Sequence, residues 1–501
     1  MRLFIFLCIA ILSFTSCTKG LLDEDPKGNL VQENFYRTDA DLELASVALY
    51  NRLNGNFISG PNYGPLFGAD DIMTVRNGNK ITYADFDTFQ ANSSNDKLNW
   101  WRNFYSLIKA ANGILNNYEQ ADQATEEKKR STAGEAHFMR GFAYFFLTRT
   151  WGEIPLVLED EVNYEIRKSS PAEVYEQILA DLLMAEELLP DSWSGIRQQN
   201  GVDIAPTKGS VKALLANVYL TMAGWPLKQT DKYQLAAAKA REVIDGRSLW
   251  GYDLLPDFGD LWKKENSYNR ETVFGCYYNI STATPVTNNS NGLVIAFMPE
   301  DEGGYGVGYG EIAFYNRFPD GPRKRATYQY EYFINNDPKN VVTYEKTLRY
   351  HPCFIKQRDA DNYNWSTHTL TGASTSRTIP VIRFAEVLLT YAEAQAMSAG
   401  PDASAYDAVN QVRRRAGLSD LTPGLSREAF RDTVVMERGW EFAGVEPAAR
   451  WFDLIRTETV GKSTQYRDAK EDPLKNIPSD TEHTFYWAPI PINDAELNPN
   501  L

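Results

Sequence analysis

The chain has 501 residues, enough for several domain-sized cores or for one continuous stacked body. Its 51 Lys and Arg against 66 Asp and Glu give a formal net charge of −15, and an acidic surface of this kind repels phosphate backbones, so no nucleic-acid partner is expected. Aromatic residues make up 13% of the chain, more than core packing obviously needs, which indicates contact surfaces that are half apolar and half polar.

The first 16 residues have the features of a signal peptide. One positive charge precedes an apolar run from Leu3 to Phe14, which is too short to span a bilayer. Small residues precede Cys17, a pattern that resembles the bacterial lipobox, although Phe14 stands where Leu is usual. We therefore expect a signal peptide over 1–16, a lipid anchor at Cys17 and a polar tether over 17–34. Ordinary secretion with a free thiol at Cys17 is the alternative.

The N-terminal region, 35–250, contains segments in which apolar residues recur at steps of three and four, the spacing of one helix face. The predicted helices cover 38–53, 98–118, 135–150, 171–189, 207–223 and 233–245. A long segment rich in Gly, Asn and Pro, Asn54 to Asn95, interrupts them, and loops of this length are usually functional or mobile. Polar residues on this loop and on the helix after it are Asp70, Asp71, Arg76 and Asn103, and Trp100 lies off that helix's apolar face.

The composition changes between residues 251 and 377 to Gly, Asn, Thr and aromatic residues, with short β-prone pieces. Glycine at every second or third position of Gly303–Gly310 is incompatible with a regular helix. We expect an irregular, loop-rich insertion that contributes Tyr305, Tyr309, Tyr363 and Trp365. Its two cysteines, Cys276 and Cys353, could form one disulfide. Two buried thiols are the favoured interpretation, because a fold of this size does not need a disulfide for its stability.

The C-terminal region, 378–501, opens with the clearest helical pattern of the chain. Phe384, Val387, Leu388, Tyr391 and Ala392 lie on one stripe of a helix over 381–396, with Pro380 expected at its first position. A second amphipathic run covers 403–416, and two helices in about 34 residues are the tetratricopeptide pattern, whose units must stack to bury their apolar faces. The sequence therefore predicts a mainly α fold with four such helix pairs.

Several segments resemble the SusD/RagB-like family. They are EAHFMRGFAYFFLTRTWGEIPLV and KGSVKALLANVYLTMAG in the first half, and IRFAEVLLTYAEA, VRRRAGL and ERGWEFAGVEPAARWFDLIR in the second. Members of this family are outer-membrane lipoproteins that capture nutrients. The resemblance implies a non-catalytic surface protein that binds an oligosaccharide and passes it to a TonB-dependent, SusC-like transporter. Some relatives deliver peptides, which is the nearer alternative.

The residues alone select no catalytic or cofactor site. Glu386 and Glu393 lie a heptad apart on one helix and are expected to be structural, either pairing with Arg383 or capping neighbours. The four histidines show no zinc spacing, and DADNYN at 359–364 departs from a calcium loop at its sixth and twelfth positions, so no metal and no cofactor are expected. A glycoside hydrolase and a helical adaptor remain as less favoured functions.

Sugar rings have an apolar face that stacks on indole or phenol rings, while their hydroxyls pair with carboxylate, amide and guanidinium groups. The 54–95 loop and the insertion are expected to form the two walls of a cleft, with Trp100, Tyr309 and Trp365 as its exposed stacking platform. The complete predicted ligand-binding set is Asp70, Asp71, Arg76, Trp100, Asn103, Tyr305, Tyr309, Tyr363 and Trp365.

Overall fold

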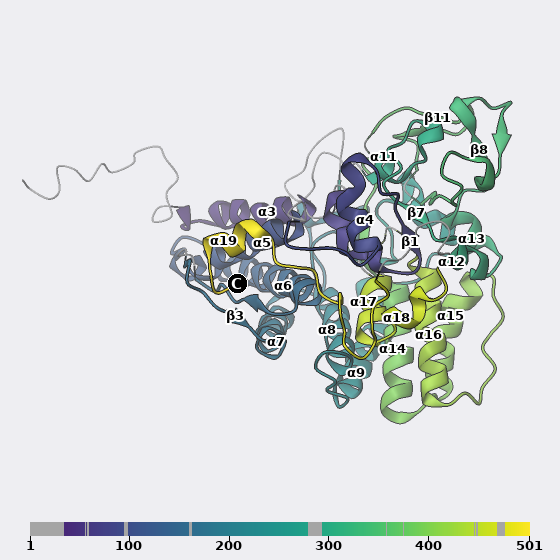
Figure 1. Ribbon diagram of the computed structural model, residues 1–501. Coiled ribbons are helices and arrows are strands. Elements are labelled where there is room, and N and C mark those ends of the chain that lie inside the picture. The colour runs from purple at the N-terminus through teal and green to yellow at the C-terminus, as the bar shows by residue number, and fades with distance from the viewer. Residues whose placement is uncertain are drawn as a thin grey trace, which may run out of the picture.

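Stacked helix pairs build most of the molecule (Figure 1). The computed structural model describes residues 35–55, 57, 60–94, 99–159, 163–278, 293–356, 358–373, 375–444, 446, 449–467 and 476–501. The helices are α3 (Asp39–Gly55), α4 (Ile81–Asp87), α5 (Asn99–Leu115), α6 (Glu126–Trp151), α7 (Pro171–Leu188), α8 (Lys208–Ala223), α9 (Lys232–Asp245), α10 (Arg247–Trp250), α11 (Leu293–Phe297), α12 (Ile312–Arg317), α13 (Pro322–Thr327), α14 (Phe384–Ala399), α15 (Ala403–Arg415), α16 (Arg427–Glu441), α17 (Ala449–Arg456), α18 (Val460–Thr464) and α19 (Ile492–Leu497).

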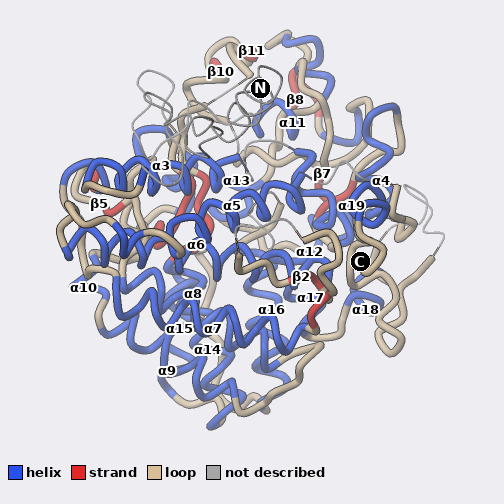
Figure 2. The backbone as a smooth tube through the Cα atoms, turned by 90° about the vertical axis from the view of Figure 1, so that its left-hand side faces the viewer, coloured by secondary structure: helices blue, strands red, loops and turns tan. Residues whose placement is uncertain are grey.

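The strands are short and pair only two by two in the described part of the chain. They are β1 (Ile72–Met73), β2 (Ile154–Pro155), β3 (Lys168–Ser169), β4 (Gln198–Gln199), β5 (Val202–Asp203), β6 (Thr272–Cys276), β7 (Tyr309–Gly310), β8 (Tyr332–Phe333), β9 (Val341–Val342), β10 (Tyr363–Asn364), β11 (Thr369–Leu370) and β12 (Ile379–Arg383). Figure 2 shows them as small red segments among helices. The predicted mainly α fold, with four helix pairs and short strands in the insertion, is confirmed.

The four pairs are α3 with α5, α6 with α7, α8 with α9, and α14 with α15, and consecutive pairs contact one another through α5–α6, α7–α8 and α9–α14. Local sequence sets where these helices begin. Ser170 forms a reciprocal capping box with Glu173 at the start of α7, and Thr207 forms one with Ser210 at the start of α8. The Asp402 carboxylate accepts two backbone N–H bonds at the start of α15. The predicted apolar stripe of α14 is buried, from Phe384 at 0% exposure to Tyr391 at 6%.

The expected helical start at Pro380 is wrong. Residues 379–383 form strand β12, which pairs antiparallel with β6 of the insertion, Pro380 opposite Gly275, and the helix begins at Phe384. Proline is tolerated in β12 because this strand has a partner on one side only. The segment thus ties the insertion to the C-terminal helices, an arrangement that local periodicity does not reveal.

The predicted pairing of Glu386 with Arg383 is also wrong. Arg438 forms the ion pair with Glu386, at 3.3 Å, and Arg456 forms the one with Glu393, so both carboxylates are structural but have partners from α16 and α17. Cys276 and Cys353 are both buried and free, which confirms the favoured reading of two thiols. Burial raises the pKa of the Cys276 thiol.

Candidate functional site

The 54–95 loop and the insertion lie against each other. β1 pairs with β7, Ile72 opposite Gly310 and Met73 opposite Tyr309, and the Thr74 hydroxyl donates to the Val307 carbonyl at 2.5 Å. The Lys80 ammonium adds an ion pair to Glu300 at 2.8 Å. The expectation that these two regions adjoin is confirmed, and the loop is more ordered than its composition suggests, because it contains β1 and α4.

Two acidic residues predicted as ligand contacts are structural instead. Asp70 is 2% exposed and accepts two bonds from the Arg450 guanidinium, at 2.6 and 2.8 Å. Burial alone would raise the pKa of Asp70, but the charge of Arg450 outweighs it and the pKa is lowered. Asp71 is 1% exposed and accepts the Gly444 backbone N–H at 2.7 Å. Both carboxylates anchor the loop to the C-terminal region, because a buried charge requires partners.

Replacing Asp71 with asparagine is expected to change how stability depends on pH. Burial, reinforced by the neighbouring Asp70, raises the pKa of Asp71 from 3.8 to about 7, although the Gly444 bond opposes the shift. The folded state therefore keeps a proton that the unfolded chain has already lost, so the stabilising contribution is complete below about pH 4 and is lost as the pH rises through about 7. Between pH 5 and pH 8 the advantage of Asp71→Asn over the wild type should grow by on the order of 1–3 kcal/mol in urea unfolding.

The amide oxygen of Asp71→Asn can still accept the Gly444 bond, so the fold should be kept. Asp70→Asn is the matched control, and it should destabilise at both pH values because it breaks the pair with Arg450. An advantage of Asp71→Asn that stays constant from pH 5 to pH 8 would show that the carboxyl does not hold a proton in the folded state.

Trp100, Tyr309 and Tyr363 do not form an exposed platform. Trp100 is 0% exposed in α5, with its ring centroid 5.5 Å from that of Phe146. Tyr309 and Tyr363 are 1% and 2% exposed. The expected stacking of ligands on Trp100 and Tyr309 is therefore wrong, because core neighbours cover both rings.

Arg76 and Asn103 are partly exposed but already engaged. The Arg76 side chain is 46% exposed and pairs with Asp85. The Asn103 amide donates to the Gly55 carbonyl at 3.3 Å and links α5 to the end of α3. Both residues keep hydrogen-bonding capacity near the 54–95 loop, so they stay predictions as ligand contacts.

Tyr305 and Trp365 are the predicted aromatic residues that the structure leaves exposed, at 61% and 48%. Trp365 packs edge to face on Tyr363, with ring centroids 4.8 Å apart, and Tyr363 packs with Ile295 and Met298. The Tyr305 N–H donates to the Ile295 carbonyl at 2.8 Å. The Tyr305 backbone and the Trp365 ring thus each contact one member of the same apolar cluster, Ile295 and Tyr363 respectively, and we call Tyr305, Trp365 and the underlying Tyr363 the aromatic surface.

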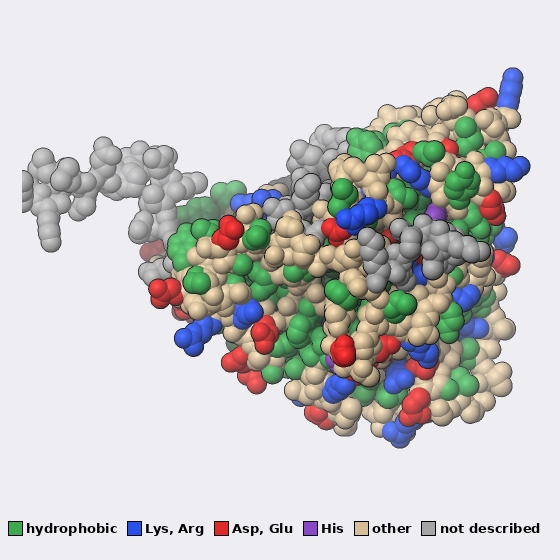
Figure 3. Space-filling model, in the orientation of Figure 1, with side chains coloured by type: hydrophobic (Ala, Val, Ile, Leu, Met, Phe, Trp, Pro, Cys, Tyr) green, Lys and Arg blue, Asp and Glu red, His purple; other side chains and the backbone are tan. Residues whose placement is uncertain are grey.

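Charged groups lie beside this surface on the turn that carries Tyr305. Glu300 accepts bonds from Lys80 at 2.8 Å and from the Arg349 guanidinium at 2.6 and 3.0 Å. Burial opposes ionisation, but these two cations outweigh it and lower the pKa of Glu300 to about 2. Local sequence does not reveal this group of Lys80, Glu300 and Arg349, because Glu300 is 220 residues from Lys80 and 49 residues from Arg349. On the face shown in Figure 3, hydrophobic side chains are exposed among polar ones over the insertion, at the upper right.

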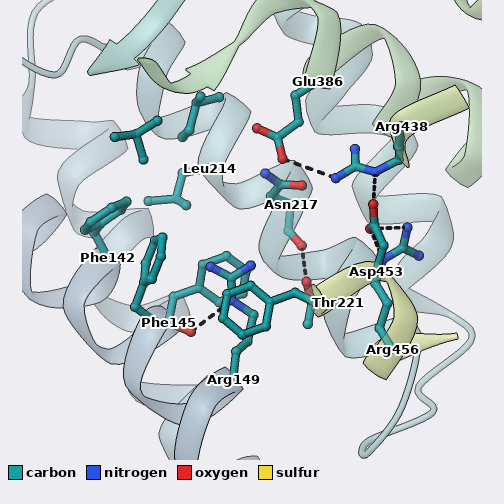
Figure 4. Close-up of a pocket in the computed structure, with 14 residues that line it drawn as sticks. Phe142, Phe145, Arg149, Leu214, Asn217, Thr221, Glu386, Arg438, Asp453 and Arg456 are labelled. Atoms are coloured by element: carbon teal, nitrogen blue, oxygen red, sulfur yellow. Dashed lines mark hydrogen bonds and ion pairs between the residues drawn. The ribbon is translucent and has the colours of Figure 1, made fainter. Parts of the chain in front are cut away.

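A separate pocket lies between α6, α8, α14 and α17 (Figure 4). Its volume is about 30 Å³, which is room for a few water molecules and not for a sugar ring. Within the described ranges, no group of three or more His, Cys, Asp or Glu side chains could hold a metal ion. The described helices also include none with the length and apolarity needed to cross a bilayer.

Two family models match the chain. The model described as "SusD family" matches residues 262–501, and the model described as "Starch-binding associating with outer membrane" matches residues 65–220. A SusD-like protein from Bacteroides ovatus is 27% identical in an alignment 472 positions long that covers 89% of this chain and 80% of the relative.

Solved structures share the fold. A SusD homologue from Bacteroides thetaiotaomicron superposes with a TM-score of 0.76 at 22% identity, covering 94% of this chain and 97% of the other. A structure described as a laminarin-binding SusD-like protein has a TM-score of 0.71 at 23% identity, covering 91% of this chain and 99% of the other. The likeness therefore extends over the helical scaffold and the insertion together.

Proposed function

Because the chain belongs to the SusD/RagB-like family, we propose that it is a non-catalytic outer-membrane protein that binds oligosaccharides and delivers them to a TonB-dependent, SusC-like transporter. The laminarin-binding relative supports a glycan ligand, and the family description that mentions starch binding and the outer membrane supports the location. Peptide binding is the second candidate, carried by the sequence resemblance alone.

The aromatic surface is the observation that carries the proposal. Trp365 presents about half of its surface to solvent while Tyr363 holds its ring from below, so a sugar can stack on it without a rearrangement of the protein. The Arg349 and Glu300 side chains, each about a quarter exposed, supply charged donors and acceptors for hydroxyl groups nearby. Flat apolar contact and fixed hydrogen-bonding groups together are what a sugar requires.

Replacing Trp365 or Tyr305 with alanine is expected to weaken glycan binding by about 1–3 kcal/mol each, roughly 5- to 150-fold in Kd. The loss arises from the stacking area removed, and the free energy of unfolding should change by no more than about 0.5 kcal/mol because both rings are exposed. Calorimetric titration with laminarin oligosaccharides, together with urea unfolding, measures both quantities.

Tyr164→Ala is the matched control for these two variants. Tyr164 is 61% exposed, as Tyr305 is, but it lies four residues before β3 in the N-terminal helical region, and Figure 1 shows β3 away from β8 and β11 of the insertion. Its loss should leave binding unchanged. If Trp365→Ala and Tyr305→Ala both bind the glycan as tightly as the wild type, the aromatic surface is not the glycan site.

Cys17 lies outside the described residues, and lipidation there stays a prediction. Cys17→Ala should move the protein from the membrane fraction to the soluble fraction after signal cleavage, because several acyl chains at one residue contribute about 0.8 kcal/mol per buried methylene. Fractionation followed by immunoblotting measures this. Membrane association that persists in Cys17→Ala would refute the anchor.

A further inference from the structure

Arg149, near the end of α6, is a cation without a carboxylate partner. Its guanidinium carbon lies 3.7 Å from the Phe145 ring centroid and 4.0 Å from the Phe452 ring centroid, so aromatic faces hold the group on both sides. Its Nε donates to the Phe145 carbonyl at 3.1 Å. Among the described residues no carboxylate forms an ion pair with Arg149, which leaves the Nη donors without a protein acceptor there.

Neighbouring charges of the pocket in Figure 4 are already paired. Asp453 accepts from Arg438 at 2.7 Å and from Arg456 at 2.8 Å, while Glu386 pairs with Arg438. Glu393 accepts the remaining bonds of Arg456. Each of these carboxylates is therefore paired with Arg438 or Arg456. Arg149 is the cation of this pocket that has no carboxylate partner among the described residues.

Arg149 also lines a second, aromatic pocket, which shares Thr221, Phe452 and Arg456 with the first. Its lining includes Tyr175, Trp225 and Trp487, and the rings of Trp225 and Trp487 lie 4.8 Å apart. The backbone N–H of Trp225 donates to the backbone carbonyl of Arg456 at 2.9 Å, which ties Trp225 to the end of α17. The pocket volume of about 10 Å³ is room for about one water molecule, so the oxygens of an anionic head group can enter it while the sugar ring that carries them stays outside.

We propose that Arg149 and these aromatic walls form a second binding site, which takes the carboxylate or sulfate group of an acidic sugar. A guanidinium offers paired in-plane donors that match the oxygens of either anion, and a partly desolvated cation gains more from an anion than an exposed one does. Trp225 and Trp487, both partly exposed, provide a surface on which the sugar ring that carries the anion can rest. Burial lowers the pKa of Arg149 only to about 10, so the side chain stays cationic at neutral pH.

This site lies on the helical scaffold, whereas the aromatic surface lies on the insertion. An experiment can therefore disprove one of the two proposed sites without disproving the other. Purified protein should be titrated calorimetrically with glucuronate, glucose 6-sulfate and glucose. At least one anionic sugar should bind tenfold or more tightly than glucose, and the preferred one tells a carboxylate from a sulfate ligand. That preference should shrink between 50 and 500 mM NaCl, since salt screens a partly exposed charge.

Arg149→Met should remove the preference for the anion, and Arg149→Lys, which keeps the charge but not the paired donors, should reduce it at least tenfold. Arg130→Met is the control, because Arg130 lies at the other end of α6 and donates to the Glu187 carbonyl on an exposed surface. The lysine variant decides the matter if the methionine variant does not fold. Equal binding of glucose and both anionic sugars by the wild type, or anion binding unchanged in Arg149→Lys, would overturn the site.

Discussion

Arg383→Ala should lower the free energy of unfolding by about 3–5 kcal/mol, one of the two largest losses that we expect from one substitution. Arg383 is 1% exposed at the end of β12 and bonds Glu271 at 2.8 Å, Glu441 at 2.7 Å and Glu446 at 2.8 Å. Alanine would leave these three buried carboxylates short of one positive charge. The three acids precede β6, end α16 and follow α16, so the same side chain holds the insertion against the C-terminal helices.

Other cations of this cluster limit the loss without replacing Arg383. Arg415 bonds Glu271 at 2.8 Å, and Lys356 bonds Glu446 at 2.8 Å. The three carboxylates therefore keep part of their compensation, which is why a folded variant is expected. Urea unfolding followed by circular dichroism measures the change.

Arg414→Ala is the matched control on α15. Its side chain is 53% exposed and pairs with Asp420 at 2.8 Å, also exposed, and surface pairs of this kind contribute little to stability. If Arg383→Ala were as stable as Arg414→Ala, the buried cluster would not hold the two regions together.

Trp100→Ala is the second substitution with a large expected effect, again about 3–5 kcal/mol of lost stability. The indole is fully buried, with Phe57, Phe104 and Phe146 at centroid distances of 6.2, 6.0 and 5.5 Å, and alanine would leave a cavity that these rings cannot close. Thermal and urea unfolding measure the loss. Glycan affinity at a temperature where the variant is folded should stay within about twofold of the wild type, because the ring reaches no solvent.

Trp365→Ala should have the opposite effect. The free energy of unfolding should be nearly unchanged, and glycan binding should be weaker. A Trp100→Ala variant that is stable and binds weakly would reverse the assignment of these two tryptophans. The pair therefore separates a core residue from a contact residue in one set of measurements.

Helices were predictable from the sequence where apolar residues recur at the spacing of one helix face. The stripe of α14 is a local feature, and local periodicity identified the helix that it defines. Residues 379–383 were missed because their strand depends on β6, more than 100 residues earlier in the chain. Pairing at that distance overrides the helical pattern of the segment.

Site residues were harder to predict because burial is a tertiary property. Trp100 lies off the apolar stripe of its own helix, yet it is covered because α5 packs against α3, α6 and the start of the 54–95 loop. Asp70 looked like a loop carboxylate, and its partner Arg450 is 380 residues away. Trp365 is exposed as predicted, and Tyr305, predicted as a ligand contact, is exposed too, since the two residues lie on the β10–β11 hairpin and on a turn of the insertion.

A binding panel of neutral oligosaccharides and peptides tests the central claim most directly, with protein that begins at Leu21 and with its Tyr305→Ala, Trp365→Ala double variant. We predict that at least one neutral oligosaccharide, laminarin-derived or other, binds the unaltered protein and that the double variant loses this binding by at least tenfold. Binding of peptides alone, or glycan binding that the double variant retains in full, would contradict the account.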